Sequence, residues 1–199
     1  MELIIILVAI IAIIVVSIMM KANTKELEKI ALNTELNEIA KKYPSNIEIS
    51  KDILKKLGNQ TTKIENDPNS EMTLYIAVQD KISIGNMHDS FTRIQTIAHE
   101  CLHSIQDKKL LMFNFIYSNI YITYFTIISI LVIVGRLSNE MLFSNILLIL
   151  SFIYYVIRTF LENDAMFKAE YLAKEYMEEH TVVSKEETIK LCMGFKKLN

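Results

Sequence analysis

Three long apolar segments constrain this chain more than any other feature of its sequence. Residues 3–20 carry no charge, and residues 110–134 and 141–157 are interrupted only by neutral polar side chains. An α-helix rises about 1.5 Å per residue, so each segment is long enough to cross most of a bilayer core about 30 Å thick. We therefore predict three transmembrane helices. The last two form a hairpin through residues 135–140, and Gly135 ends the second helix.

The composition narrows the class of protein further. Residues 3–20 have no basic flank before them and no small-residue cleavage site after them, which favours an uncleaved anchor over a secretory signal. A formal net charge of −2 argues against a nucleic-acid partner. Two cysteines are too few for a disulfide framework and fit a reducing compartment.

The distribution of basic residues predicts the orientation in the membrane. Residues 21–109 carry thirteen Lys and Arg, residues 161–199 carry six, and the 135–140 connection carries one. Basic residues near span ends mark the cytoplasmic side. We expect a multi-pass protein of the cell membrane, with both large polar segments in the cytoplasm.

The polar segments predict a mainly α-helical domain with a small β-hairpin, an α+β fold. Residues 24–43 have helical apolar spacing that ends at Pro44, and Ser50 is a plausible N-cap of a helix closing at Gly58. Residues 71–78 and 81–84 alternate as two short strands. The expected organisation is an anchor (1–20), a polar domain (21–109), a transmembrane hairpin (110–160) and a C-terminal helical segment (161–199).

One motif in the polar domain carries chemistry. His99-Glu100-Cys101-Leu102-His103 lies in a segment with the apolar spacing of a helix. Two His at i and i+4 project from one face, where both imidazoles can bind the same Zn²⁺. Glu100 follows the first His, so its carboxylate can accept a proton from a water activated by the metal.

A catalytic zinc needs a third protein ligand, and the sequence leaves several candidates open. Glu162 follows the third apolar segment, and His103 precedes the second, so both lie near one membrane face. Asp164 is an alternative ligand, or an acceptor for the Nδ1–H of a ligand His. Glu170 and His88 are further candidates. Glu162 could also be an acidic residue that favours a helix N-terminus.

The residues 98–106, Ala-His-Glu-Cys-Leu-His-Ser-Ile-Gln, together with Glu162-Asn-Asp-Ala165, resemble a known family. They are similar to the neutral zinc metallopeptidases of bacterial membranes, a gluzincin-type family with an A-H-E-x-x-H core and a downstream E-x-x-A helix. The resemblance implies a zincin-like domain in which one Zn²⁺ is held by His99, His103 and Glu162, with Glu100 as the base. It also implies membrane anchoring and peptide hydrolysis.

We therefore expect a membrane-anchored zinc endopeptidase whose partners are a peptide or protein substrate and the lipid bilayer. An extended substrate would pair with one of the predicted strands, 71–78 or 81–84. Tyr75, His88 and Tyr171 are candidates for stabilising the oxyanion. The alternatives are a non-catalytic membrane interaction module stabilised by zinc, and a membrane scaffold in which the motif is accidental.

Overall fold

The computed structural model describes residues 30, 32–70, 72–87 and 90–198. The predicted first span, residues 3–20, lies outside this part of the chain. The described residues form six α-helices, one short 3-10 helix and a three-stranded sheet. In chain order these are α3 (Thr34–Lys41), α4 (Asn46–Lys56), β1 (Lys63–Asn66), β2 (Leu74–Ile76), η1 (Ala77–Gln79), β3 (Lys81–Ile84), α5 (Arg93–His103), α6 (Lys108–Ile133), α7 (Glu140–Glu179) and α8 (Lys185–Leu198). The mainly helical prediction is confirmed.

The start of α4 differs from the prediction. Ser45, not Ser50, is the N-cap: its hydroxyl accepts from the backbone N–H of Glu48, whose carboxylate accepts from the backbone N–H of Ser45. This reciprocal capping box satisfies donors that the first helical turn leaves unpaired. Ser50 is fully buried one turn later, and its hydroxyl donates to the carbonyl of Asn46. The predicted end is right, because Gly58 adopts the left-handed φ of 70° that ends many helices.

The predicted hairpin is part of a larger sheet. β2 and β3 pair antiparallel as expected, with Tyr75 opposite Ile82. The sequence did not predict β1, which pairs parallel to β3 and makes β3 the central strand. Polar residues occupy three of its four positions, so β1 lacks the apolar alternation that marks a strand.

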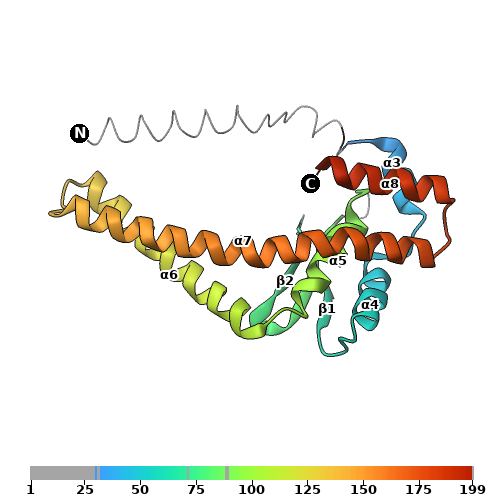
Figure 1. The fold of residues 1–199 in the computed structure, drawn as a ribbon, viewed down its shortest axis with the longest axis horizontal. Helices are drawn as coiled ribbons and strands as arrows, with labels where there is room; N and C mark the ends of the chain where they lie inside the picture. Colours follow the sequence, from blue (N-terminus) through green and yellow to red (C-terminus); the bar gives the residue numbers. More distant parts are fainter. Residues whose placement is uncertain (1–29, 31, 71, 88–89, 199) are drawn as a thin grey trace.

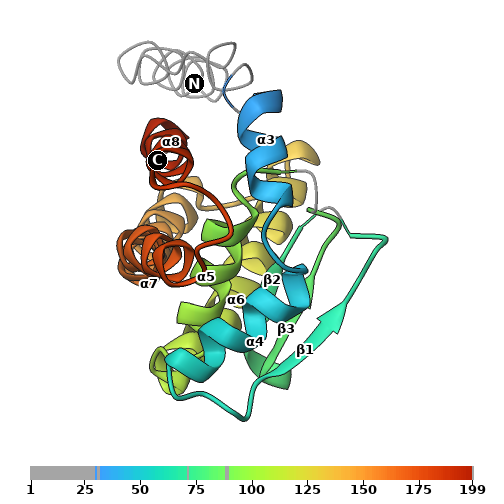
Figure 2. The ribbon, with the colours of Figure 1, turned by 90° about the vertical axis from the view of Figure 1, so that its right-hand side faces the viewer.

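Helix α5 lies at the centre of the polar domain (Figure 2). It packs against α7 on one side, and against α4 and the sheet on the other. Its apolar residues are fully buried, as the spacing predicted, and they join one core with α3, α4, β3, α7 and α8. The buried α5 members of this core are Ile94, Ile97, Ala98, Cys101 and Leu102.

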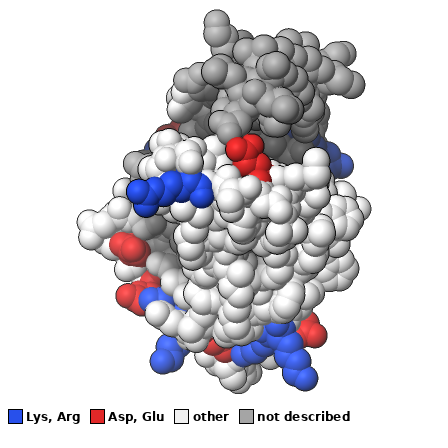
Figure 3. Space-filling view, turned by 90° about the vertical axis from the view of Figure 1, so that its left-hand side faces the viewer, with Lys and Arg blue, Asp and Glu red and all other residues white. Residues whose placement is uncertain are grey.

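Helices α6 and α7 form an antiparallel pair that leaves the polar domain (Figure 1). Both are long and apolar enough to cross a membrane, and almost no residue of their most apolar stretches is buried within the protein. Gly135 ends α6 with a positive φ of 63°. Viewed from the end where the two helices connect, the surface is mostly uncharged (Figure 3). Two helices with the dimensions of membrane spans are therefore present in the described residues.

The predicted separation of the transmembrane hairpin (110–160) from a C-terminal helical segment (161–199) is wrong for the helix itself, because α7 continues from Glu140 to Glu179 without a break. Neither Gly nor Pro interrupts this stretch, so nothing in the backbone ends the helix where the composition turns polar. The pair is joined by tyrosines of α6: the Tyr117 and Tyr124 hydroxyls donate to carbonyls of α7. Such hydrogen bonds stabilise helix pairs where no water competes.

Arg93 joins the ends of two helices inside the core. Its side chain is fully buried, and its Nη2 group donates to the carbonyls of Ala40, Tyr43 and Pro44 at 2.8–2.9 Å. Its Nη1 group donates to the side chain of Asn46 at the start of α4. These bonds give charged donors to carbonyls at and just after the end of α3, of which that of Ala40 also accepts from the backbone N–H of Tyr43.

Replacing Arg93 by Met should lower the free energy of unfolding by about 3 kcal/mol, because buried carbonyls lose charged donors. Arg136→Met is the matched control, since Arg136 is exposed in the α6–α7 connection, and its effect should stay within about 0.5 kcal/mol. Denaturant unfolding of the detergent-solubilised chain measures both. Equal stability of the two variants would contradict the assigned role.

Candidate metal centre

Helix α5 places two imidazoles on one face. His99 and His103 are four residues apart, and their Nε2 atoms lie 3.0 Å from each other. The neighbouring face of α5 is buried, with Ala98 and Cys101 fully covered, so the helix cannot rotate the two rings away from this position. The i, i+4 geometry predicted from the sequence is confirmed.

Helix α7 brings the third side chain. Glu162 Oε2 lies 3.3 Å from His99 Nε2 and 3.7 Å from His103 Nε2. Three and seven residues further along α7, Ala165 and Ala169 are fully buried in the core. Small side chains on this face let α5 and α7 approach closely, which brings the carboxylate within reach of both rings. Glu162 lies inside α7, so it does not mark a helix N-terminus.

The three side chains form a group that could hold a metal ion, and their ligand atoms all lie within 4.8 Å of one another. His103 is the least accessible, with 12% of its side chain exposed, and Glu162 is 39% exposed. The group is therefore held by the core on one side and open on the other. One accessible side is what a site needs to admit a ligand from outside.

The charges of the group depend on one another. Hydrogen bonds from His103 and His99 hold the pKa of Glu162 well below its usual range. Burial by itself would lower the pKa of His103, but its hydrogen bonds to Glu162 and Gln106 and the nearby carboxylates raise it overall. The imidazoles and the carboxylate therefore stabilise one another's charged forms, as opposite charges in contact do.

Gln106 fixes the orientation of His103. Its amide nitrogen donates to the carbonyl of Leu161 and to Asp164, so its oxygen faces His103 Nδ1 at 2.8 Å. His103 then carries its proton on Nδ1 and leaves the lone pair of Nε2 free for a metal. Asp164 was one of the candidates from the sequence for this contact. Asp164 instead lies behind Gln106, and Lys168 binds its other oxygen at 2.5 Å.

Glu100 joins the group to the sheet. One of its oxygens accepts from the backbone N–H of Tyr75 in β2 at 2.6 Å. Burial raises the pKa of Glu100, and the nearby His103, the Tyr75 N–H and His99 oppose this rise. The Glu100 carboxylate is thus held close to the three candidate ligands without belonging to their group. A raised pKa brings a carboxylate closer to the range in which it exchanges protons near neutral pH.

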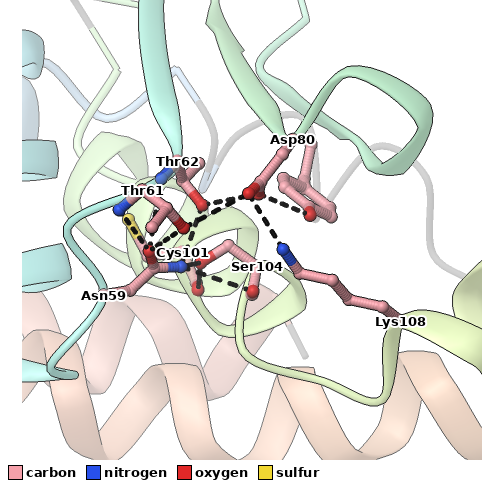
Figure 4. A network of polar contacts seen from close by, with 8 residues as sticks. Asn59, Thr61, Thr62, Asp80, Cys101, Ser104 and Lys108 are labelled. Carbon is pink, nitrogen blue, oxygen red and sulfur yellow. Dashed lines mark hydrogen bonds and ion pairs between the residues drawn. The ribbon is translucent and has the colours of Figure 1, made fainter.

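Asp80 fixes the position of β2 relative to α6 (Figure 4). Its carboxylate accepts from the Thr62 hydroxyl at 2.7 Å, from the Tyr75 hydroxyl at 2.9 Å and from Lys108 at 2.9 Å. Asn59 donates to both Thr62 and Ser104, so the same network reaches the end of α5. Desolvation would raise the pKa of Asp80, but these donors lower it to about 2.

The remaining candidates from the sequence lie away from the group. Glu170 pairs with Lys196 at 3.5 Å, and Tyr171, with 75% of its area exposed, lines a separate cavity between α7 and α8. The Tyr75 hydroxyl is bound to Asp80, so its backbone N–H and not its phenol faces Glu100. His88 lies outside the described residues.

Besides Gln106, two residues near the group were not predicted from the sequence. Arg158 lies 3.5 Å from the second oxygen of Glu162, one turn earlier on α7, where i, i+4 spacing was a usable signal. The role of Asp80 had no comparable signal, because its partners come from three separate elements. Comparisons of the chain with protein-family models, curated proteins and solved structures find no match.

Replacing Glu162 by Ala should abolish stoichiometric metal binding, because two imidazoles alone leave the site without its charged ligand. Asp164→Ala is the control: it removes a carboxylate from the same turn of α7 but leaves the three ligand atoms in place, and Gln106 keeps its shorter bond to the Leu161 carbonyl. Metal analysis after zinc loading and gel filtration measures both. Zinc retained by Glu162→Ala but lost from Asp164→Ala would reverse the assignment.

Asp80→Asn should destabilise the chain at neutral pH by about 1–2 kcal/mol, since its donors, which also include the Thr61 hydroxyl, lose a charged acceptor. Asn tolerates the left-handed φ of 46° at this position, so the change isolates the charge. The folded pKa of about 2 lies below the unfolded value of about 3.9, so the carboxylate stabilises the fold above about pH 4. That contribution is lost as the pH falls toward 2.

Thermal unfolding in detergent at decreasing pH measures this effect. The difference between wild type and Asp80→Asn should be constant above about pH 4 and shrink below it. Glu38→Gln, which removes a carboxylate with a 70% exposed side chain on α3, is the matched control for the loss of one negative charge. A constant difference between wild type and Asp80→Asn at every pH would contradict the prediction.

Proposed function

We propose that this chain is a membrane-anchored zinc endopeptidase. The observation that carries the proposal is the position of Glu100: its carboxylate is half-buried next to three side chains that could ligate a metal, but it is bound to the backbone of β2. A purely structural metal site has no use for such a carboxylate. A hydrolytic site needs it as a general base.

The donor set favours zinc. Two ligands about 2.0–2.1 Å from a tetrahedral Zn²⁺ lie about 3.3 Å apart, and the three ligand atoms here are separated by 3.0, 3.3 and 3.7 Å. Two imidazoles and one carboxylate form the ligand set of catalytic zinc sites that keep a fourth position open. Zinc bound there would supply Lewis acidity, which polarises a carbonyl and lowers the pKa of water.

The chain's own residues would manage the proton. Glu100 accepts a proton from the attacking water as the water oxygen bonds to the scissile carbonyl carbon. Glu100 then delivers that proton to the amide nitrogen as the C–N bond breaks, which releases a carboxylic acid and an amine. In the structure the Tyr75 N–H donates to Glu100. When the Glu100 carboxylate rotates toward the attacking water, this N–H becomes free to donate to the substrate backbone.

Strand β2 is the better of the two predicted docking strands. β3 is paired on both sides, whereas β2 is an edge strand. The Tyr75 N–H points away from β3 toward Glu100, so a substrate strand added to this edge would run beside the base and the metal ligands. The distribution of basic residues supports a cytoplasmic position for this site.

Glu100→Gln should retain zinc but reduce peptide cleavage by roughly 10²–10⁴-fold, because the amide cannot accept the proton. Glu170→Gln is the control. It changes a carboxylate on α7 that lies away from the group and pairs with Lys196 of α8, so this variant should retain full activity. The assay follows cleavage of a peptide mixture by the zinc-loaded chain in lipid nanodiscs, with zinc content measured in parallel. Wild-type activity in Glu100→Gln would refute the proposal.

A further inference from the structure

A cavity of about 360 Å³ connects the metal ligands to the membrane hairpin. Its walls come from β2 and η1, from the first turns of α6, and from α7 around Glu162. In Figure 1, α6 and α7 lie close at their connection and separate toward the polar domain, where β2 lies. The cavity occupies this wider end.

The α6 wall extends into the apolar segment. The lining residues Leu111, Asn114, Phe115 and Ser118 share one face of the helix at spacings of three and four residues. From Leu111 to Ser118 the wall descends about 10 Å along the helix axis. The predicted span begins at residue 110, so this wall lies below the level at which the chain becomes apolar. An occupant therefore sits partly at the depth of the lipid.

The cavity has the size and chemistry for part of a polypeptide. Ligand pockets span about 300–1,000 Å³, so this one is at the small end and fits one or two side chains. Most of its lining is apolar, including Leu74, Leu111 and Phe115. Among the described residues, the buried Asn114 Oδ1 has no hydrogen-bond partner, which leaves an acceptor for a donor supplied by the occupant.

The edge of β2 sets the direction of the occupant. Leu74 and Val78 line the cavity, and η1 contacts α6, so the edge strand leads from the metal ligands toward the hairpin. A substrate polypeptide paired with β2 would have its scissile bond at the metal ligands, and the residues on one side of that bond would run toward the membrane. Arg158 lies beside Glu162, at the end of the apolar segment. Backbone carbonyls of the bound substrate would leave the apolar layer at this level.

We propose that the substrates are polypeptides anchored in the same membrane, cut in an extended stretch next to their transmembrane segment, with an apolar side chain bound between β2, α6 and α7. This inference rests on the proposed peptidase function. It adds the substrate class, and it assigns Ser118, at the membrane end of the cavity, as a determinant of side-chain size.

The first experiment compares two probes with the zinc-loaded full chain in nanodiscs. One is a peptide with a randomised stretch joined to a Leu/Ala helix of about twenty residues; the other has the same stretch with a polar tail. Cleavage sites are read by mass spectrometry. The anchored probe should be cut roughly 10–100-fold faster, next to the anchor and beside an apolar residue. Equal rates for both probes would overturn the proposal.

The second experiment fills the cavity. Ser118→Phe should reduce cleavage beside large apolar residues roughly 10–100-fold relative to cleavage beside Ala. Asn119→Phe makes the same change in bulk on an exposed position of α6 that does not line the cavity, and its preference should match wild type. Zinc content confirms that both variants keep the metal site. An unchanged preference in Ser118→Phe would exclude the assigned role.

A third measurement separates this inference from the peptidase function. The Glu100→Gln chain is irradiated with the anchored peptide carrying a photoreactive leucine, and the cross-links are mapped. Cross-links to residues 111–118 support the cavity as the binding site even if wild type cleaves nothing, in which case the peptidase function alone fails. Cross-links confined to other surfaces would overturn the inference even if cleavage occurs.

Discussion

The packing of α5 against α7 is the contact on which the metal centre depends. α5 supplies two ligands that are neighbours by local helix geometry, whereas Glu162 is 59 residues after His103 in the sequence. Only close approach of the two helices brings them together. The fully buried Ala98 on α5 and Ala165 on α7 leave no side-chain bulk to hold the helices apart. Ala165, three positions after Glu162, therefore has to be small because a larger side chain there would push α5 and α7 apart.

The same helix that supplies Glu162 also forms half of the apolar hairpin. Since α7 is continuous, the carboxylate stays at a fixed height above the apolar segment, about 8 Å from its end at residue 157. Asp80 adds a second connection, because its carboxylate binds Lys108 at the start of α6 and Tyr75 in the edge strand. The position of the site relative to the hairpin is thus set on two sides.

The features that the sequence predicted correctly are those that depend only on neighbouring residues in the chain. The spacing of His99 and His103 and the apolar lengths of α6 and α7 follow from helix geometry alone, and the structure confirms them. The errors came where a tertiary contact or a competing cap decides. β1 is polar and becomes a strand only by pairing with β3. The prediction divided α7 into two segments because the composition changes near residue 160, but the helical backbone continues through that point. The role of Gln106 depends on Leu161, which spacing cannot place beside it.

Two of the candidate ligands come from one helix, α5, and the third comes from α7, which is distant in the sequence. The two imidazoles remain neighbours whenever α5 is helical, so they form a weak site even without the rest of the fold. The third ligand and the Gln106 contact to Leu161 arrive only when α7 docks. Under the proposed function, metal affinity would therefore report the docking of α7 against α5, and by linkage a bound metal would stabilise that docking. One continuous helix, α7, therefore carries both an apolar stretch long enough to cross a membrane and the carboxylate of the candidate metal site.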